Sequence, residues 1–438
     1  MKIFFVNDTS DCPNWGCRAT TAALKRMLSL HNPSYEITHT LYLKRMSATD
    51  RYIEKRYKKI EKLTSSVVGT FPAGKSLANY VNSRWVAPHW KKIANVRDAM
   101  PTSFAEFPSF ASKVLAGEVM QPERAALEAC DLVFINGEGS IYDRQRKGRM
   151  MLFIAYLAKV HFNKPCVLAN HTADVHDPVM AEMVAQVYPL LDDVIFREPL
   201  SAEACQAFVR EDNSVLAADA AFTYRPIDRA TFSALAARDS YFSIHPDSAS
   251  GFDPSRPYIC IGGSSIYLRG DRPAYDPIPG FKVLCEKLQN YVAPVVLTAP
   301  DPKDELIFRP IAKALGLPLI SLTTPTQQAV DILGNASVYV SGRWHPSILA
   351  LTGGTPIITF TANTYKTQAL VQQMGLETPT LDALNLHEIA SDVVDLAKHY
   401  LEQGEPLRQQ LRDRAEELSK LAQKNVRYLE SLTTSTAA

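Results

Sequence analysis

The stretch Val338–Pro346, which reads Val-Tyr-Val-Ser-Gly-Arg-Trp-His-Pro, decides the fold. Its apolar beginning predicts a short buried strand that ends near Ser341. A helix can begin at Pro346, because proline suits the first helical position, and it stops before Gly353-Gly354. A strand that turns directly into a helix is the unit from which parallel α/β sheets are built.

The same alternation of short apolar runs and helical patterns extends along the chain. Strands are predicted at 2–6, 131–136, 165–169, 193–197, 257–262, 294–298, 337–341 and 356–360. Helices are predicted between most of them, at 17–29, 146–162, 178–190, 281–291, 303–315 and 326–334. This order predicts an α/β fold with parallel sheets, whose ligands bind at the carboxyl ends of the strands.

A chain of 438 residues is too long for one typical domain. The alternation is weakest in a proline-rich stretch, which we interpret as a linker at 226–256. We therefore predict two Rossmann-like domains, 1–225 and 257–438, that face each other across a ligand-binding cleft. The leucine pattern of Pro406–Tyr428 predicts a long terminal helix with a packing face, directed toward the first domain.

Residues 44–125 differ from the rest of the first domain, with few strand signals, much helix potential and a basic beginning. We interpret this segment as a solvated helical insertion. The alternative is a surface that meets anionic lipid or an acidic glycan, which would place the protein at the inner face of a membrane.

The overall composition narrows the class of protein further. A formal net charge of +1 does not fit a protein whose main partner is nucleic acid. The first residues lead directly into a strand, and the uncharged run at 346–365 contains turn residues that do not suit a membrane span. Seven cysteines without a Cys-x-x-Cys pair favour reduced thiols, so we expect a cytoplasmic protein.

Arg343 and His345 are the strongest candidates for a functional site. They lie on the strand-to-helix turn, beside outward-pointing backbone N–H groups that form a natural anion site. An arginine there can hold a phosphate or carboxylate through two parallel hydrogen bonds, and a histidine can move a proton near neutral pH. The alternative is a helix-capping histidine beside a salt-bridged arginine.

Further candidate site residues follow other predicted strands, and each of them alone is weak evidence for a functional site. They are the first strand-to-helix turn with Asn14 and Gly16, the loop residues Gly137, Glu138, Gly139 and Ser140, then Arg197, Asp219 and Lys366. The glycines would let the backbone approach a ligand closely, and Lys366 would be a phosphate ligand or simply a solvated lysine.

Taken in order, these motifs resemble the polysaccharide pyruvyl transferase family, from Asn14 to Lys366. The resemblance implies two facing Rossmann-like domains similar to those of GT-B glycosyltransferases. It implies phosphoenolpyruvate as the donor and a sugar of a cell-surface polysaccharide or its lipid-linked precursor as the acceptor. By position, Arg197, Arg343 and His345 match the donor-binding and catalytic group, with Lys366 as a weaker member.

The chain departs from the family pattern in the first domain. Cys17 stands where the family usually has Asp, the 136–139 loop has fewer glycines, and 170–177 replaces a glycine-rich turn. His171 in that segment could touch the acceptor sugar. His171, Asp174, His176 and Asp177 would also suit a metal, but Asp177-Pro178 is more simply a helix cap, so we expect no metal.

The expected reaction needs no cofactor, because phosphoenolpyruvate is a substrate. An acid protonates its methylene carbon, a sugar hydroxyl attacks, phosphate leaves, and a second hydroxyl closes a pyruvate ketal. His345 is the expected acid or base, with Glu138 and Asp219 as weaker candidates. The alternatives are a nucleotide-sugar glycosyltransferase of the same architecture and a catalytically silent glycan-binding relative. The sequence does not indicate an oligomeric state.

Overall fold

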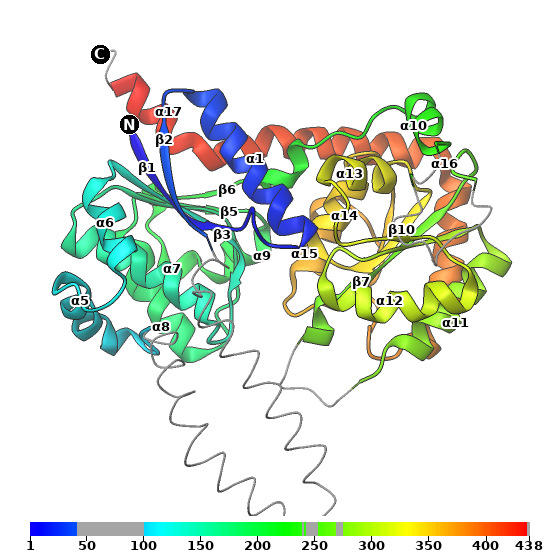
Figure 1. The fold of residues 1–438 in the computed structure, drawn as a ribbon, viewed down its shortest axis with the longest axis horizontal. Coiled ribbons are helices and arrows are strands. Elements are labelled where there is room, and N and C mark those ends of the chain that lie inside the picture. Colours follow the sequence, from blue (N-terminus) through cyan, green and yellow to red (C-terminus); the bar gives the residue numbers. More distant parts are fainter. Residues whose placement is uncertain (42–99, 239–240, 242–252, 269–274, 436–438) are drawn as a thin grey trace, which may run out of the picture.

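The computed structural model describes residues 1–41, 100–238, 241, 253–268 and 275–435. Figure 1 shows two α/β domains side by side, the first mostly blue to green and the second mostly yellow to orange. Most of the predicted insertion at 44–125 lies outside the described residues, as does part of the predicted linker at 226–256. The predicted architecture of two domains with parallel sheets is confirmed.

The first sheet is parallel throughout, with the spatial order β2-β1-β3-β4-β5-β6. Its strands are β1 (Lys2–Asp8), β2 (Glu36–Leu41), β3 (Leu132–Ile141), β4 (Cys166–Ala173), β5 (Asp193–Phe196) and β6 (Ser214–Leu216). Continuous apolar runs such as 3–6 are buried on both faces, as central strands of a parallel sheet require. The sequence did not predict β2 and β6, because β2 contains polar residues at four of its six positions and β6 has only three residues.

The second sheet is also parallel, with the order β11-β10-β7-β8-β9. Its strands are β7 (Ile259–Ser264), β8 (Val295–Thr298), β9 (Leu319–Ile320), β10 (Val338–Gly342) and β11 (Ile357–Thr359). The two-residue β9 was not predicted, because so short a run leaves no periodic signal.

Each sheet has one place where the strand order reverses. In the first sheet the chain goes from β1 to β2 on one side and to β3 on the other; in the second, β8 and β10 flank β7. Ligands of open α/β sheets bind at such switch points, outside the carboxyl ends of the strands. The carboxyl-terminal part of β3 carries the candidate residue Glu138, and the segments after β1 and β10 carry Asn14, Gly16, Arg343 and His345.

Helices cover both faces of the two sheets (Figure 1). The first domain has α1 (Trp15–His31), α5 (Phe107–Leu115), α6 (Gln121–Ala129), α7 (Arg146–Tyr156), α8 (Pro178–Val187) and α9 (Pro199–Ala204), and α10 (Arg229–Ala236) follows it. The second domain has α11 (Ile278–Tyr291), α12 (Pro302–Leu315), α13 (Thr326–Gly334), α14 (Trp344–Leu351), α15 (Lys366–Gln373) and α16 (Leu386–Ala422), whereas α17 (Arg427–Ser435) lies against the first domain (Figure 1). Helix α14 begins at Trp344, two residues before the predicted start, so Pro346 lies in its first turn, where proline is tolerated.

The terminal helix α16 runs from the second domain across to the first (Figure 1). It bends at Gly404, whose φ of 55° interrupts the helix. Leu407, Leu411 and Leu418 are buried on its packing face. Beyond it, Arg427 forms a bidentate ion pair with Asp193 of β5, with N–O distances of 2.6 and 2.9 Å.

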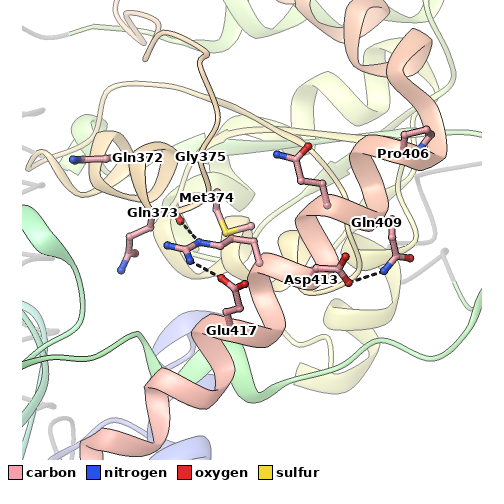
Figure 2. Close-up of a pocket in the computed structure, with 10 residues that line it drawn as sticks. Gln372, Gln373, Met374, Gly375, Pro406, Gln409, Asp413 and Glu417 are labelled. Atoms are coloured by element: carbon pink, nitrogen blue, oxygen red, sulfur yellow. Dashed lines mark hydrogen bonds and ion pairs between the residues drawn. The ribbon is translucent and has the colours of Figure 1, made fainter.

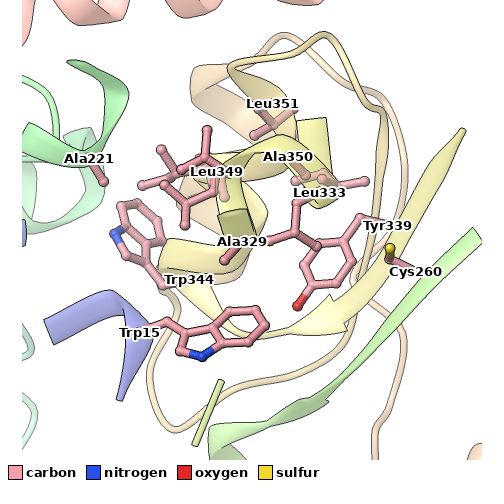
Figure 3. Close-up of a cluster of buried hydrophobic side chains, with 14 of the residues drawn as sticks. Trp15, Ala221, Cys260, Ala329, Leu333, Tyr339, Trp344, Leu349, Ala350 and Leu351 are labelled. Carbon is pink, nitrogen blue, oxygen red and sulfur yellow. The ribbon is translucent and has the colours of Figure 1, made fainter. Parts of the chain in front are cut away.

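One hydrophobic core extends through both domains. Trp15 of α1 is fully buried and lies with Trp344 and Tyr339 of the second domain (Figure 3). Ala221, just after β6, reaches the same cluster from the first domain. The opposite face of the first sheet has a separate core under α5, α7 and α8. The contact between the domains therefore includes buried apolar side chains, as a protein core does, in addition to polar contacts.

Candidate functional site

A buried carboxylate, Asp219, lies at the centre of the contact between the domains. Its Oδ1 caps a short 3-10 helix by accepting a hydrogen bond from Ala221 N at 2.8 Å. Its Oδ2 accepts hydrogen bonds from Arg197 Nη1 at 2.8 Å and from Trp344 Nε1 at 2.9 Å, one from each domain. Burial raises the pKa of Asp219, but the charges of His345 and Arg197 outweigh burial and hold it well below its ordinary value of 3.8. The carboxylate is therefore ionised and binds the two domains together.

Arg197, the first residue after β5, extends from the first domain to the second. It is 1% exposed, and its Nε donates to Thr172 Oγ1 at 2.9 Å. Its guanidinium carbon lies 4.9 Å from the centre of the Trp344 ring, a cation–π contact, and Nη1 lies 3.3 Å from His345 Nε2. Arg197, Asp219, Trp344 and His345 form a junction cluster, in which the structure brings together the two predicted site residues Arg197 and His345.

His345, in the first turn of α14, packs against the first turn of α1. A Cβ on Gly16 would lie only 2.2 Å from His345 Nδ1, so the ring rests directly on the glycine backbone. On its other side, Nε2 lies 3.4 Å from Asp219 Oδ2. The imidazole is thus held between a helix N-terminus of the first domain and a carboxylate that can orient its ring.

Arg343, the residue between β10 and α14, is paired with acids of its own domain. Its Nε and Nη2 donate to the two oxygens of Asp304 at 2.9 and 2.7 Å, and Nη2 lies 3.5 Å from Asp301 Oδ1. Burial raises the pKa of Asp304 to about 6 against the opposing effect of the guanidinium. The salt-bridged arginine that the sequence left open is what the structure shows, and the pair fixes the plane of the guanidinium.

Lys366 begins α15 and is half-buried beside the two arginines. Its Nζ donates to Asn363 Oδ1 at 2.5 Å. Burial, then the positive charges of Arg197 and Arg343, lower the pKa of Lys366 to about 7. Cations of both domains therefore lie close enough to repel one another, and an anion placed among them would relieve that repulsion.

Glu138 lies near the end of β3 and is 4% exposed. Its Oε1 accepts a hydrogen bond from Thr9 Oγ1 at 2.7 Å. Its Oε2 accepts one from Lys147 Nζ at 2.9 Å and one from Cys17 Sγ at 3.6 Å. Burial raises its pKa, but Lys147 and His345 lower it further than burial raises it. Cys17, the departure from the family pattern, is therefore a donor to this carboxylate.

Three of the predicted glycines make room for site side chains. A Cβ on Gly139 would lie 2.9 Å from Arg197 Nη2, and one on Gly137 would lie 2.3 Å from His171 Cβ. Gly16 accommodates His345 in the same way. Their close approach is to neighbouring side chains of the protein, whereas the sequence had suggested approach to a ligand. The fourth loop residue, Ser140, is buried, and its carbonyl oxygen faces α7.

His171 is a core histidine. It is fully buried with Nδ1 2.9 Å from Ile195 O, and its ring packs between Tyr188 and Phe196. Burial lowers its pKa to about 3, so the ring is neutral. It has no surface with which to touch an acceptor sugar.

The other residues of the 170–177 segment have structural partners. Asp177 caps α8 by accepting hydrogen bonds from Val179 N and Met180 N, as the cap prediction requires. Asp174 pairs with His176 near the surface. Within the described part of the chain, no three His, Cys, Asp or Glu side chains come together as metal ligands.

Asn14 connects the domains and at the same time caps α1. Its Oδ1 accepts hydrogen bonds from Gly16 N at 2.9 Å and Cys17 N at 3.2 Å. Its Nδ2 donates to Asp301 Oδ2 of the second domain at 3.1 Å. The structure thus places Asn14 beside the acids that hold Arg343, at the edge of the site.

Trp15 and Arg18 extend the same contact, and sequence reasoning did not single them out. Trp15 N donates to Pro300 O at 3.0 Å, and Arg18 Nη2 donates to Leu322 O at 3.1 Å and Thr324 O at 3.0 Å. The first turn of α1 is therefore inserted between the loops that follow β8 and β9.

The sequence model of the polysaccharide pyruvyl transferase family matches residues 14–364, which is most of the chain. This chain belongs to that family. No curated protein matches the sequence.

Solved structures with a similar fold include GT-B enzymes, two of them determined with UDP or UDP-GlcNAc bound. UDP-GlcNAc 2-epimerase from Neisseria meningitidis bound to UDP-GlcNAc has a TM-score of 0.55 at 10% identity, over 98% of this chain and 100% of that one. The S. aureus MnaA–UDP co-structure has a TM-score of 0.54 at 11% identity, over 99% and 97%. Spinosyn rhamnosyltransferase SpnG has a TM-score of 0.53 at 12% identity, over 98% and 100%. At such identities the likeness shows the fold alone.

In this pyruvyl transferase family member, the segment Arg197-Glu198-Pro199-Leu200-Ser201 forms the turn between β5 and α9. Glu198 caps α9 by accepting a hydrogen bond from Ser201 N at 3.0 Å. Ser201 Oγ accepts one from Ala173 N at 2.9 Å and contacts the hydroxyl of Tyr365 from the second domain at 3.2 Å. The acid and the serine therefore fix the turn from which Arg197 projects.

The transferase has a hollow of about 680 Å³ on the outer side of α15, between α15 and α16 (Figure 2). Its lining is mostly amide and charged, and it includes Gln373, whose Nε2 donates to Arg197 O at 3.1 Å. Arg197 itself does not line the hollow. Among the described helices, none is both long and apolar enough to cross a membrane.

Proposed function

We propose that this family member transfers the enolpyruvyl group of phosphoenolpyruvate to a sugar hydroxyl of a cell-surface polysaccharide or its precursor. The product is a pyruvate ketal, and phosphate is released. The observation that supports this proposal is that Arg197 of the first domain and Arg343 and Lys366 of the second lie close enough to influence one another electrostatically, with His345 Nε2 3.3 Å from Arg197 Nη1. The reaction needs several cations beside a proton-transferring group, because the donor carries a phosphate and a carboxylate close together.

The arginines are positioned to receive an anion. Asp219 and Asp304 hold the guanidinium groups in fixed planes, which leaves Arg197 Nη2 and Arg343 Nη1 without a hydrogen-bond partner among the described residues. Preorganised donors of this kind stabilise negative charge without the cost of reorienting at the moment of reaction. Lys366, which is easily deprotonated in the free protein, would take up a proton when the phosphate arrives.

The reaction requires one proton to be added to the methylene carbon of the donor and one proton to be removed from each of the two sugar hydroxyls. His345 would protonate the methylene carbon of the donor, so that positive charge develops on the neighbouring carbon. A sugar hydroxyl attacks that carbon, the carbon–oxygen bond to phosphate breaks, and a second hydroxyl closes the ketal. Arg197 and Arg343 would hold the phosphate as it leaves, so that no metal ion is needed for charge neutralisation.

Entry of the donor would require movement at the junction cluster. Arg197 and Arg343 are 1% and 6% exposed, and Asp219 is fully buried. The donor would therefore enter a more open arrangement and be enclosed when the domains return to this one, which would exclude water from the reactive intermediate.

The predicted cytoplasmic location at the membrane face stays a prediction, because the basic segment that motivates it lies outside the described residues.

Phosphorus NMR of the protein with phosphoenolpyruvate and a panel of methyl glycosides tests the proposal. We expect inorganic phosphate to appear only when a suitable acceptor is present, and Arg343→Ala and His345→Ala to abolish it. Arg309→Ala, on the exposed face of α12, is the matched control and should leave the rate unchanged. Turnover of UDP-sugars instead would favour a glycosyltransferase, and acceptor binding without any turnover would favour a silent glycan-binding relative.

A further inference from the structure

Glu138 occupies the switch point of the first sheet in an unusual backbone conformation. Its φ is +46°, in the left-handed region that residues other than glycine seldom adopt. Strain of this kind costs on the order of 1 kcal/mol or more and persists where the surrounding structure enforces it, often at functional sites. The carboxylate of this residue is held by neighbours on three elements, Thr9 after β1, Cys17 of α1 and Lys147 of α7.

The other buried carboxylates at or near the junction cluster are already occupied by ion pairs or helix caps. Asp219 binds Arg197 and Trp344, and Asp304 binds Arg343 through both oxygens. Glu198 caps α9 beneath Arg197. Glu138 is instead held by a lysine, a hydroxyl and a thiol, which are donors that a sugar hydroxyl could displace or join.

Glu138 is linked to the proposed acid through the first turn of α1. His345 rests on the backbone of Gly16, and the next residue, Cys17, donates to Glu138. The two groups are close enough for the charge of His345 to lower the pKa of Glu138. A proton donor from the second domain and a carboxylate from the first thus both contact the first turn of α1.

We propose that Glu138 is the catalytic residue that accepts the proton of the acceptor hydroxyl, and that the acceptor sugar binds at the β1–β3 switch point. Lys147 and Cys17 are positioning residues for this carboxylate. This inference rests on the proposed function. It adds to that function the place of the acceptor and the identity of the base.

Two groups, His345 and Glu138, account for all the proton transfers of the reaction. His345 gives its proton to the methylene carbon, and the attacking hydroxyl gives its proton to Glu138 as its oxygen bonds to the cationic carbon. When the carbon–oxygen bond to phosphate breaks, Glu138 passes its proton to the departing phosphate. The second hydroxyl closes the ring and returns a proton to His345. An ionised carboxylate suffices as the base, because attack on a cationic carbon makes the hydroxyl acidic.

The test uses Glu138→Gln, which keeps the shape of the side chain and removes its basicity. We expect calorimetry to show phosphoenolpyruvate binding within about threefold of wild type, while phosphate release with methyl glycosides falls about 100-fold or more. Glu138→Asp should recover at least part of the rate. Glu128→Gln on the exposed side of α6 is the control and should change neither quantity.

A second variant keeps the carboxylate and changes its charge environment. The groups that face Glu138 are Lys147, His345, Cys17 and Thr9, and Lys147 is the largest influence lowering its pKa. Lys147→Met should therefore move the acid limb of the kcat–pH profile to higher pH. This variant also serves if Glu138→Gln does not fold.

The outcomes separate the two proposals. A wild-type protein that binds no phosphoenolpyruvate overturns the proposed function and this role with it. A wild-type protein that turns over, with Glu138→Gln equally fast, overturns the role of Glu138 alone. Loss of donor binding in Glu138→Gln would also overturn it, because the carboxylate would then be needed to hold the donor in place and not only to transfer protons.

Discussion

At the scale of single residues, the two arginines owe their orientation to buried acids. Asp219 and Asp304 are fully buried and each accepts charged hydrogen bonds at 2.7–2.9 Å. A buried ion pair contributes little net stability, but losing one partner leaves the other charge uncompensated. The pairs are therefore better explained by the need to hold guanidinium groups in a fixed plane than by stability.

Asp219→Asn should show this dependence on charge. We expect the free energy of unfolding at pH 7 to fall by about 3 kcal/mol, because Arg197 loses its buried partner. The folded-state pKa of Asp219 is lowered from 3.8, so its stabilisation is complete above about pH 4 and is lost as pH falls further. Urea unfolding should show the difference between wild type and variant shrinking below about pH 4; a constant difference would contradict the assignment.

Lys366 should couple donor binding to proton uptake. Its pKa in the free protein is lowered to about 7, and a bound phosphate would favour the ammonium form and raise it. Affinity for phosphoenolpyruvate should therefore weaken as pH rises above about 7. Calorimetry in two buffers of different ionisation enthalpy measures the uptake directly. Lys366→Gln should bind more weakly and lose this uptake, and unchanged uptake would rule Lys366 out.

At the scale of elements, the site is formed where the first turns of α1 and α14 meet. Gly16 has no side chain, so the His345 ring can rest on the backbone of α1. The N-termini of both helices bring partial positive charge to this place, which suits an anionic ligand.

Gly16→Ala should displace His345 with little other damage to α1. The new Cβ would lie 2.2 Å from the imidazole, so we expect phosphate release to fall about 100-fold as the ring loses its position. Gly316→Ala at the end of α12 is the control. Its Cβ meets no atom within 4 Å, although its φ of 64° adds strain, so it should lower the melting temperature and leave the rate unchanged. Equal rates for Gly16→Ala and wild type would contradict the packing described.

The sequence predicts those site residues that directly follow strands. Arg197, Arg343 and Lys366 follow the strands β5, β10 and β11, and the strand-end rule for parallel sheets finds them. Asp304 could not be found in this way, because it looks like an ordinary acid in the first turn of an exposed helix. Its role depends on a contact with Arg343 across 39 positions of sequence. His171 was misjudged because a strand end does not reveal that aromatic rings will enclose the side chain.

At the scale of the whole molecule, the domains are joined by several separate contacts. Trp15 enters the second domain's core, the junction cluster connects the centres, and Tyr365 reaches Ser201. The fold class followed from strand and helix alternation. The close contact between the domains could not be predicted in this way, because it arises from pairs such as Arg18 and Leu322 that are 304 positions apart.

Arg18→Ala should loosen the joint in the free protein. It removes two hydrogen bonds from a guanidinium to backbone carbonyls, together worth about 2–3 kcal/mol. Small-angle X-ray scattering should show a larger radius of gyration for the variant than for wild type, and phosphoenolpyruvate should reverse the change. Identical curves without the donor would mean that the turn of α1 does not hold the domains together.

The most direct measurement is a crystal structure of the complex with phosphoenolpyruvate. The proposed function predicts one donor molecule between the domains, with Arg197 Nη2 and Arg343 Nη1 both within hydrogen-bond distance of it and His345 facing its methylene carbon. A donor held by one domain alone, or by neither arginine, would contradict the proposal.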